Sequence, residues 1–536
     1  LFRTRTDKIK HFLSNPAMKK RFVFGFLLLL FLAFKTIAQQ DTSVLKLSDT
    51  AGNLPADTSA VFPESGIIIA DDGLQPEEPK LSINGYIQAD DRLQFNGGKL
   101  NRQEYRLDVK LDYKPFDRGK LFTEVWLRAY KYPEIYTVGD LSDKKKILNF
   151  DADVREAYFD IYGLFTKNLD VRIGRQRIAW GTADRLNPTD NLNPYDMEDI
   201  WDFGRHLGSN AIKLTYYAGT FTFTGVAIPW FTPSVLPGQD WTQAFMPEVK
   251  IPAMITDTSF MPGLRIPIYL TPRSISDTLI MPQRDIRHYP SFGLKAKKSI
   301  GNFDISLSYV YGRDALPLPT ELYTNMTIDT FTVFPEVRAD ATIDIRTKVG
   351  FPVMKVLGLD FAGSIKDVGI WGEAACFFPG KNHMKRYLHY DFPDFGISKD
   401  SVLTDSLVLD SKPYVKFVVG LDYTFKHGFY LNFQYLHGFV HERGPKELND
   451  YYMLALEWTS GNGRIKIGIL NGGVQVNKYN DLKNNLAWIY MPEISYKPVD
   501  NTELILGAHL LDGSPTTSFG KVTKNDDIYL KLKYSF

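Results

Sequence analysis

The chain has 536 residues, of which 63 are basic, 62 are acidic and one is a cysteine. The balanced charge argues against a nucleic-acid partner, which requires a clustered basic surplus. The single cysteine, Cys376, excludes an internal disulfide, and neither zinc-ligand spacing nor a phosphate-binding glycine loop occurs, so we expect no metal and no cofactor.

A secretory signal peptide is predicted at residues 18–38. Met18 is followed by the basic stretch Lys19–Arg21 and by the apolar run Phe22–Phe34, and small residues precede a cleavage point before Gln39. The apolar run is shorter than the about 20 residues that a membrane-spanning helix needs. A membrane anchor is the alternative to this interpretation.

Two further N-terminal stretches are set apart from the folded part. We interpret residues 1–17 as an over-read of the start, and 39–80 as a flexible periplasmic leader because it is rich in Asp, Thr, Ser and Pro. Without residues 1–38 the chain carries 55 basic and 61 acidic groups, so the exported form is mildly acidic.

From residue 81 to 536 the dominant pattern is an alternation of apolar and polar residues. Between Tyr105 and Tyr113 every second residue is apolar and every residue between them is charged. Since successive side chains of a strand point to opposite faces, such a strand has one apolar and one polar face. The pattern recurs at 303–311, 415–423 and 528–536. Segments of about 10 residues suit strands that cross a bilayer at a tilt.

The connections alternate between tight turns and long loops. Tight turns are expected at Pro115–Gly119, Phe165–Asn168, Ala218–Thr220, Ser299–Asn302, Lys366–Asp367, Lys426–Gly428, Gly461–Gly463 and Pro498–Asn501. Longer loops are expected at 131–150, 179–208, 229–288, 313–357, 379–412 and 472–485. Only a closed barrel leaves no sheet edge in lipid. The prediction is an all-β fold: one transmembrane antiparallel β-barrel over 81–536 with about 18 strands. Sixteen is the alternative, because the strand between Asp344 and Ile365 is the least certain.

The last strand ends at Phe536 after Tyr534, Leu532 and Leu530. It resembles the C-terminal signature of bacterial outer-membrane proteins. The resemblance implies that Phe536 and Tyr534 form an assembly signal for the barrel-assembly machinery. It also implies an outer-membrane location, with lipid and lipopolysaccharide as surroundings. An even strand number would place both termini in the periplasm.

The segment 171–208 is rich in arginine. Strict alternation would aim Arg175 and Arg177 at lipid, whereas a bulge at Gly174 and Arg175 would turn them into the lumen, and we favour the bulge. The result would be a row of guanidinium groups suited to carboxylate or phosphate ligands. The candidate anion-binding residues are Arg172, Arg175, Arg177, Arg185 and Arg205. The alternative is that these arginines pair with Asp160, Glu156 or Asp170.

The following loop repeats an Asn-Pro-x-Asp tetrad, at 187–190 and 193–196. Pro194 suits the first turn of a helix, so we predict a helix over Met197–Phe203 that folds inward and narrows the pore. The candidate constriction residues are Asn187, Asp190, Asn193, Asp196 and Trp201. The acidic residues do not match the spacing of an EF-hand, so we favour helix capping over a calcium site.

Three motifs carry a family resemblance: Arg172–Gln176, Trp180 with Gly181, and the two tetrads. They resemble porin-like outer-membrane barrels of Gram-negative bacteria, in the style of alginate-export and substrate-specific porins, of the kind found in Bacteroidota. The resemblance implies passage or export of a small or polymeric, anionic solute.

A long segment at 229–290 is rich in Pro, Met and aromatic residues, including Trp230 and Trp241. It is predicted to pack into or across the barrel mouth as a lid, and a surface docking loop is the alternative.

We therefore expect a channel for small, anionic or carbohydrate solutes, oligosaccharides included, with an arginine-rich constriction. The alternative is a non-conducting barrel that acts as a scaffold or as a partner in an export complex. An enzyme is not expected, because none of the nine histidines lies in a nucleophile motif.

Overall fold

The computed structural model describes residues 80–130, 138–142, 144–147, 149–245, 251–257, 265–283 and 290–536. The predicted over-read start, signal peptide and leader, up to residue 79, lie outside the described residues. The chain divides into two compact units. The unit of Leu81–Gln94 and Lys99–Phe536 contains all the strands of the described residues, and the other unit is Leu1–Lys80 with Phe95–Gly98.

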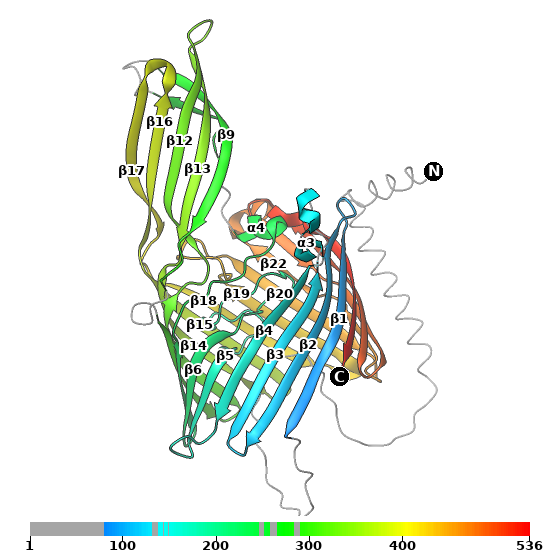
Figure 1. The fold of residues 1–536 in the computed structure, drawn as a ribbon. Coiled ribbons are helices and arrows are strands. Elements are labelled where there is room, and N and C mark those ends of the chain that lie inside the picture. Colours follow the sequence, from blue (N-terminus) through cyan, green and yellow to red (C-terminus); the bar gives the residue numbers. More distant parts are fainter. Residues whose placement is uncertain are drawn as a thin grey trace, which may run out of the picture. The chain divides into compact units, whose positions relative to one another are not determined.

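One sheet of twenty strand segments closes into a barrel, because β1 pairs with both β2 and β26 (Figure 1). Consecutive barrel strands are antiparallel throughout. The segments are β1 Leu81–Gln94, β2 Leu100–Phe116, β3 Gly119–Tyr130, β4 Phe150–Ile161, β5 Leu169–Gln176, β6 Ser209–Ala218, β7 Phe221–Ile228, β10 Ser291–Ile300, β11 Phe303–Arg313, β14 Val353–Ile365, β15 Val368–Pro379, β18 Tyr414–Thr424, β19 Phe429–His437, β20 Asp450–Thr459, β21 Ile465–Gly468, β22 Gly472–Val476, β23 Leu486–Tyr490, β24 Glu493–Val499, β25 Thr502–Gly513 and β26 Asp527–Ser535.

Two barrel strands are interrupted. β21 and β22 both pair with β20, and β23 and β24 both pair with β25. Counting each interrupted pair once reduces the twenty segments to eighteen strands, which confirms the predicted number. The least certain predicted strand is present as β14.

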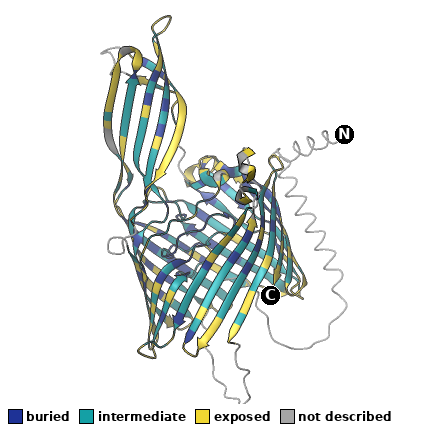
Figure 2. Ribbon diagram, in the orientation of Figure 1, coloured by how far each residue is buried: buried dark blue, intermediate teal, exposed yellow. Residues whose placement is uncertain are grey.

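The alternation places apolar side chains outside the barrel and polar ones inside. On β1, Ile83 and Ile87 are 53% and 54% exposed, whereas Asp90 is 3% exposed. On the neighbouring β2, Asp108 is 1% exposed. Figure 2 shows exposed and buried positions alternating along the barrel strands. A closed barrel with an apolar outer surface and paired backbone groups has the surface that a bilayer requires. Separately, no helix among the described residues is long and apolar enough to span a membrane.

All eight predicted tight turns join consecutive barrel strands, and they share one end of the barrel. The start of β1 and the end of β26 lie at this short-turn end, because Leu81 pairs with Tyr113 and Thr502 pairs with Tyr534. The long loops leave from the opposite, long-loop end.

A second sheet was not predicted. Its six strands are β8 Met254–Asp257, β9 Ile266–Leu279, β12 Leu318–Thr332, β13 Arg338–Gly350, β16 Asn382–Phe392 and β17 Ile397–Leu409, in the order β17-β16-β12-β13-β9-β8. They come from three of the predicted long loops. Ile268, Met326, Ile328 and Phe392 form its buried core. These loops therefore form an ordered sheet rather than irregular connections.

The predicted lid at 229–290 is divided between two environments. β8 and β9 belong to the six-stranded sheet, whereas the short helix α4 (Gln239–Phe245) packs against residues inside the barrel. The remaining short helices are η1 Val138–Ser142, α3 Lys144–Ile147, η2 Pro393–Phe395, η3 Lys426–Gly428, η4 Tyr479–Asp481, α5 Leu482–Asn485 and η5 Gly520–Asn525.

The closing seam leads to a first prediction. Gly85 and Phe536 exchange two backbone hydrogen bonds of 3.0 Å, and β1 and β26 pair from Tyr86 with Ser535 to Gln94 with Asp527. Deleting Phe536 should remove both bonds and lower the fraction of folded barrel in the membrane fraction, measured as the heat-modifiable band on a gel. The conductance of each inserted molecule should be unchanged. A truncated chain that folds at the normal level would contradict this expectation.

Candidate functional site

The candidate site is the connection between β5 and β6, residues 177–208, which we call the lumen segment. It contains no regular helix, so the predicted helix over Met197–Phe203 is wrong. Its backbone bonds to distant partners instead: Asp196 N–H donates to Arg205 O (2.8 Å) and Met197 N–H to Val235 O (3.0 Å). The local bonds, Asp202 N–H to Asp199 O (3.1 Å) and Arg205 N–H to Asp202 O (3.4 Å), span three residues each and form isolated turns.

Asp199 ties the lumen segment to β1. Its two oxygens accept hydrogen bonds from Nη1 and Nη2 of Arg92, at 2.8 and 2.6 Å. Arg92 also donates to both oxygens of Asp90 on the same strand, at 3.0 and 2.7 Å. All three side chains are buried. Bidentate pairs of this kind fix orientation as well as adding energy.

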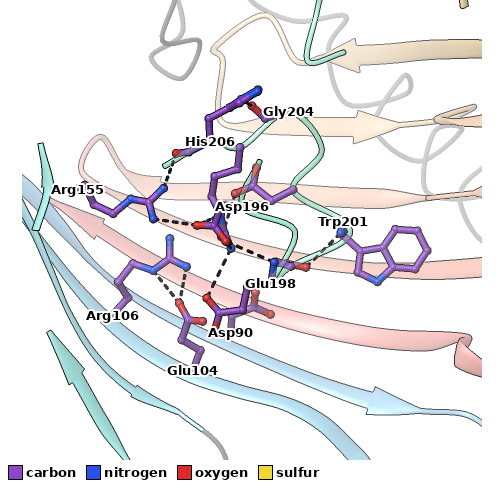
Figure 3. Close-up of polar contacts among 12 residues, drawn as sticks. Asp90, Glu104, Arg106, Arg155, Asp196, Glu198, Trp201, Gly204 and His206 are labelled. Atoms are coloured by element: carbon purple, nitrogen blue, oxygen red, sulfur yellow. Dashed lines mark hydrogen bonds and ion pairs between the residues drawn. The ribbon is translucent and has the colours of Figure 1, made fainter. Parts of the chain in front are cut away.

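Asp196 provides a second tie, to β4. It accepts from Arg155 Nη1 at 2.8 Å and lies 3.0 Å from Arg205 Nε, so one carboxylate joins the barrel wall to the segment itself. Arg155 also donates to the carbonyl of His206 at 2.9 Å. Figure 3 shows these contacts beside Glu198, which accepts from Arg128 of β3 at 2.6 Å.

The barrel wall next to these contacts contains Trp126, whose ring is covered by guanidinium groups. The guanidinium carbons of Arg106 and Arg155 lie 3.9 and 4.3 Å from the ring centre of Trp126. A cation over the face of an indole ring is attracted by its quadrupole. Arg155, which holds the segment, is therefore held in place itself.

The carboxylates of the segment stay ionised because arginines surround them. Burial raises the pKa of Asp199, but Arg92 and Arg102 outweigh it and hold the pKa well below its usual range. Burial likewise raises the pKa of Asp196, and Arg205 and Arg155 lower it further than burial raises it. Both ion pairs should thus persist under mildly acidic conditions.

On the opposite wall of the barrel, Glu373 of β15 binds the other half of the lumen segment. This carboxylate is buried, and its hydrogen bonds from described residues all come from the lumen segment. Its donors are the backbone N–H groups of Thr182, Ala183 and Thr189, the side-chain amide of Asn187 and the hydroxyl of Thr189. Gln434 of β19 adds a bond to Asp184 O at 3.3 Å.

Apolar contacts complete the attachment. The ring of Trp201 stacks on His509 of β25 with a centroid distance of 3.9 Å and an interplanar angle of 5°. Trp180 and Leu192 press against the inner side of β10 at Gly293, where an added Cβ would lie 2.7 Å from Trp180. Since β15 lies across the ring from β1, the segment crosses the lumen and is fixed to both walls.

Four of the five predicted arginines lie next to carboxylates. Arg172 bonds to Asp160 at 2.7 Å, which is the predicted alternative. Arg177 pairs with Asp190 and Arg205 with Asp196, and Arg175 lies 3.9 Å from Asp153. Arg185 is exposed and forms no ion pair with any described residue. Whether these groups also bind solute anions stays a prediction.

The predicted bulge at Gly174 and Arg175 is wrong. β5 keeps a continuous register with both neighbours, from Val171 to Arg175 against β4 and through Gln176 against β6. The bulge lies one strand earlier: Glu124 pairs with Glu156 and Val125 with Val154, so Arg155 is the extra residue. That bulge keeps Arg155 on the inner face beside Glu156, where it reaches Asp196.

The five predicted constriction residues all take part in holding the segment. Asn187 binds Glu373, Asp190 binds Arg177, and Asp196 and Trp201 contact the wall as described. Asn193 accepts from Ile178 N–H (2.7 Å) and donates to Leu207 O (2.9 Å), which joins the two ends of the segment. No group of three or more potential ligands suited to a metal occurs in the described part of the chain.

The wall residues Arg92, Glu373 and His509 are not among the site residues predicted from the sequence. Arg92 and Glu373 are charged residues at inward positions of strands, where any barrel carries polar groups. Glu373 stands out only because its strand is otherwise apolar from Ala374 to Phe378. Nothing in the sequence indicates which loop each residue would meet.

A second prediction concerns pH: protonation of His206 at acidic pH should destabilise the lumen segment. Burial, followed by the neighbouring Arg177, lowers the pKa of His206 to about 4. The pKa of His206 is lower in the folded protein than its ordinary value of 6.5, so the lumen segment has its full stability above pH 6.5. It loses stability as the pH falls towards 4. The full effect is about 3 kcal/mol.

The measurement is hydrogen exchange of residues 195–207 at pH 7 and pH 4.5, corrected for the intrinsic rate. His206→Gln should reduce the acid effect, and His427→Gln, in a short turn, should not. Burial also lowers the pKa of His441 to about 4, so some acid sensitivity should remain in the first variant. Equal acid sensitivity in wild type and His206→Gln would contradict the assignment.

Comparison with solved structures finds outer-membrane porins at low similarity. The outer membrane protein OmpT of Vibrio cholerae, in a form lacking loop L8, is 10% identical with a TM-score of 0.35, over 85% of this chain and 99% of that chain. OmpF of Salmonella typhi, in complex with daunomycin, is 8% identical with a TM-score of 0.34, over 85% and 97%. A mutant porin of Rh. blastica is 9% identical with a TM-score of 0.34, over 85% and 100%. Similarity at this level supports no argument about function.

No family model matches the sequence, and no curated protein matches it. The resemblance to alginate-export and substrate-specific porins, and the Bacteroidota origin, therefore stay predictions.

Proposed function

We propose that the chain is an outer-membrane channel of the porin type, exported through its N-terminal signal, that passes small polar solutes. The observation that carries the proposal is a closed barrel with a polar interior whose lumen is crossed by a segment fixed to both walls. The lumen segment narrows the lumen and determines what passes.

The barrel interior supports a water-filled path between the short-turn end and the segment. A barrel of about 16–18 strands encloses an aqueous channel unless loops fill it. The inner faces near the short turns carry charged side chains that remain partly exposed, such as Lys110, Glu457 and Lys466. We place the short turns in the periplasm and the long loops outside the cell, as in other barrels of this type.

Small organic anions and carbohydrates are the proposed solute classes. The ion pairs of the segment neutralise Arg92, Arg155 and Arg205, so these arginines hold the segment rather than present free charge. Of the five predicted arginines, Arg185 is exposed and forms no ion pair with any described residue. A preference for anions should therefore depend on Arg185 more than on the other four.

A second candidate function is a surface scaffold or a partner in an export complex. The observation that favours it is the six-stranded sheet, which gathers strands from three separate loops around a buried core of its own. A channel does not require such a sheet.

Liposome swelling and planar-bilayer recordings of the purified protein distinguish the two. For a channel we expect uptake of a monosaccharide above that of empty liposomes, little uptake of a tetrasaccharide, and a reversal potential on the anion side. Arg185→Glu should move that potential towards cations, whereas Arg205→Glu should chiefly disturb the segment. Absence of swelling and conductance, together with a stable co-purifying partner, would contradict the channel and support the scaffold.

A further inference from the structure

A cavity of about 80 Å³ lies beside the lumen segment at the long-loop end of the barrel. It is bounded by residues 186–188 and 191–195, by 230–232 and by the ends of β11 and β18. A single water needs roughly 10–15 Å³ on this measure, so the cavity has room for a small organic molecule. Its apolar walls include Trp230, Phe231, Val356, Phe377 and Tyr414.

The cavity contains a buried lysine. Lys416 is 5% exposed, and its ammonium group donates to the carbonyls of Phe439 (2.6 Å) and Val440 (3.2 Å). An ammonium group has three N–H donors, so one remains without an acceptor among the described residues. Lys416 also forms no ion pair with any of them. A buried charge without a counter-ion is costly.

Two tyrosine hydroxyls also lack partners. Tyr195 and Tyr414 both line the cavity, and neither hydroxyl has a hydrogen-bond partner among the described residues. Tyr414 is only 4% exposed, and a buried tyrosine hydroxyl usually has a partner. Both hydroxyls are therefore available to something inside the cavity.

The acidic group of the lining is already neutralised. Asp314 lies 2.5 Å from Arg443 Nε and accepts from Leu316 N–H at 2.9 Å. The lining thus retains the positive charge of Lys416, which forms no ion pair with any described residue. This charge favours an anion over a cation or a neutral molecule.

We propose that this cavity binds a small organic carboxylate with an apolar body. The carboxylate accepts from the free N–H of Lys416 and from the hydroxyls of Tyr195 and Tyr414, and the apolar body lies against Trp230 and Phe377. As a solute site the inference rests on the proposed channel function, but the binding itself does not require transport.

The test is isothermal titration of the full-length protein in detergent with benzoate and with benzamide, which has the same shape and no charge. We expect saturable binding of benzoate at one site and at least about tenfold weaker binding of benzamide, as for a hydrogen bond to a charged group. Lys416→Met should abolish that preference. Tyr414→Phe should weaken benzoate about three- to tenfold, as for one neutral hydrogen bond. Lys466→Met, outside the cavity lining, should change nothing.

Several results would overturn the inference. They are no benzoate binding to the folded wild type, equal binding of benzoate and benzamide, or full preference retained in Lys416→Met. If Lys416→Met does not fold, the double variant Tyr195→Phe and Tyr414→Phe decides, because it keeps the shape of the lining. Benzoate binding in a protein without conductance would overturn the channel alone, and conductance without benzoate binding would overturn only this site.

Discussion

Glu373→Ala should raise the single-channel conductance of the barrel several-fold. The substitution removes the acceptor of every hydrogen bond that Glu373 receives from residues 182–189. The five donors are neutral and would lose their acceptor, and each buried unsatisfied donor costs about 1–3 kcal/mol. That cost falls on the segment, since the donors belong to it, so the segment should leave the β15 wall.

The matched control is Asp360→Ala. Asp360 is also a buried inward-facing carboxylate, but it accepts from Lys295 and Ser306, which belong to barrel strands. Its loss should leave the conductance unchanged. An equal conductance in Glu373→Ala and wild type, with both barrels folded, would show that this contact does not keep the lumen narrow.

Asp199→Ala is expected to free the opposite side of the segment from β1. Arg92 keeps its pair with Asp90, so losing its hydrogen bonds to Asp199 should cost about 1.5–3 kcal/mol. That range corresponds to exchange of the backbone amides of 195–207 that is faster by roughly one to two powers of ten. The measurement is hydrogen exchange by mass spectrometry at neutral pH.

Asp202→Ala provides the control for Asp199→Ala. Its side chain is 52% exposed and lies 3.4 Å from Arg205, and an exposed pair contributes at most about 1 kcal/mol. Exchange in this variant should therefore be close to that of wild type. If the amides of both variants exchanged at the same rate, the pair of Asp199 with Arg92 would not be what holds the lumen segment on β1.

The barrel could be predicted because its physical cause is local. Apolar and polar residues alternate along each strand, as at Tyr105–Tyr113, and each tight turn contains Gly, Pro, Asn or Asp. Strand number follows from counting these signals. The strand at Val353–Ile365 was uncertain only because another alternating segment, Arg338–Gly350, precedes it directly.

The six-stranded sheet could not be separated from the barrel by the same signal. β12 and β13 alternate as barrel strands do, yet β12 pairs in parallel with β16 and β13 with β9. Parallel pairing between distant loops depends on tertiary contacts that no local pattern encodes. The sequence therefore indicated loops where the chain forms a second core.

The candidate site was predicted in its composition and not in its contacts. The arginines and the tetrads were identified, but their interpretation depended on partners such as Arg92 and Glu373, which come from strands on opposite walls. The bulge was expected at Gly174 because a glycine beside an arginine out of register suggests one. The bulge lies at Arg155 instead, where the carboxylate of Asp196 stabilises an inward-facing guanidinium group.

The most direct test is the conductance of a barrel without the central part of the lumen segment. Residues 182–204 would be replaced by a short Gly-Ser linker, and single-channel recordings compared with wild type after gel analysis confirms that both barrels fold. If the segment narrows the lumen, the deletion should give a stable open channel of much larger conductance that also passes a tetrasaccharide. A deletion variant with the conductance and size limit of wild type would contradict the central claim.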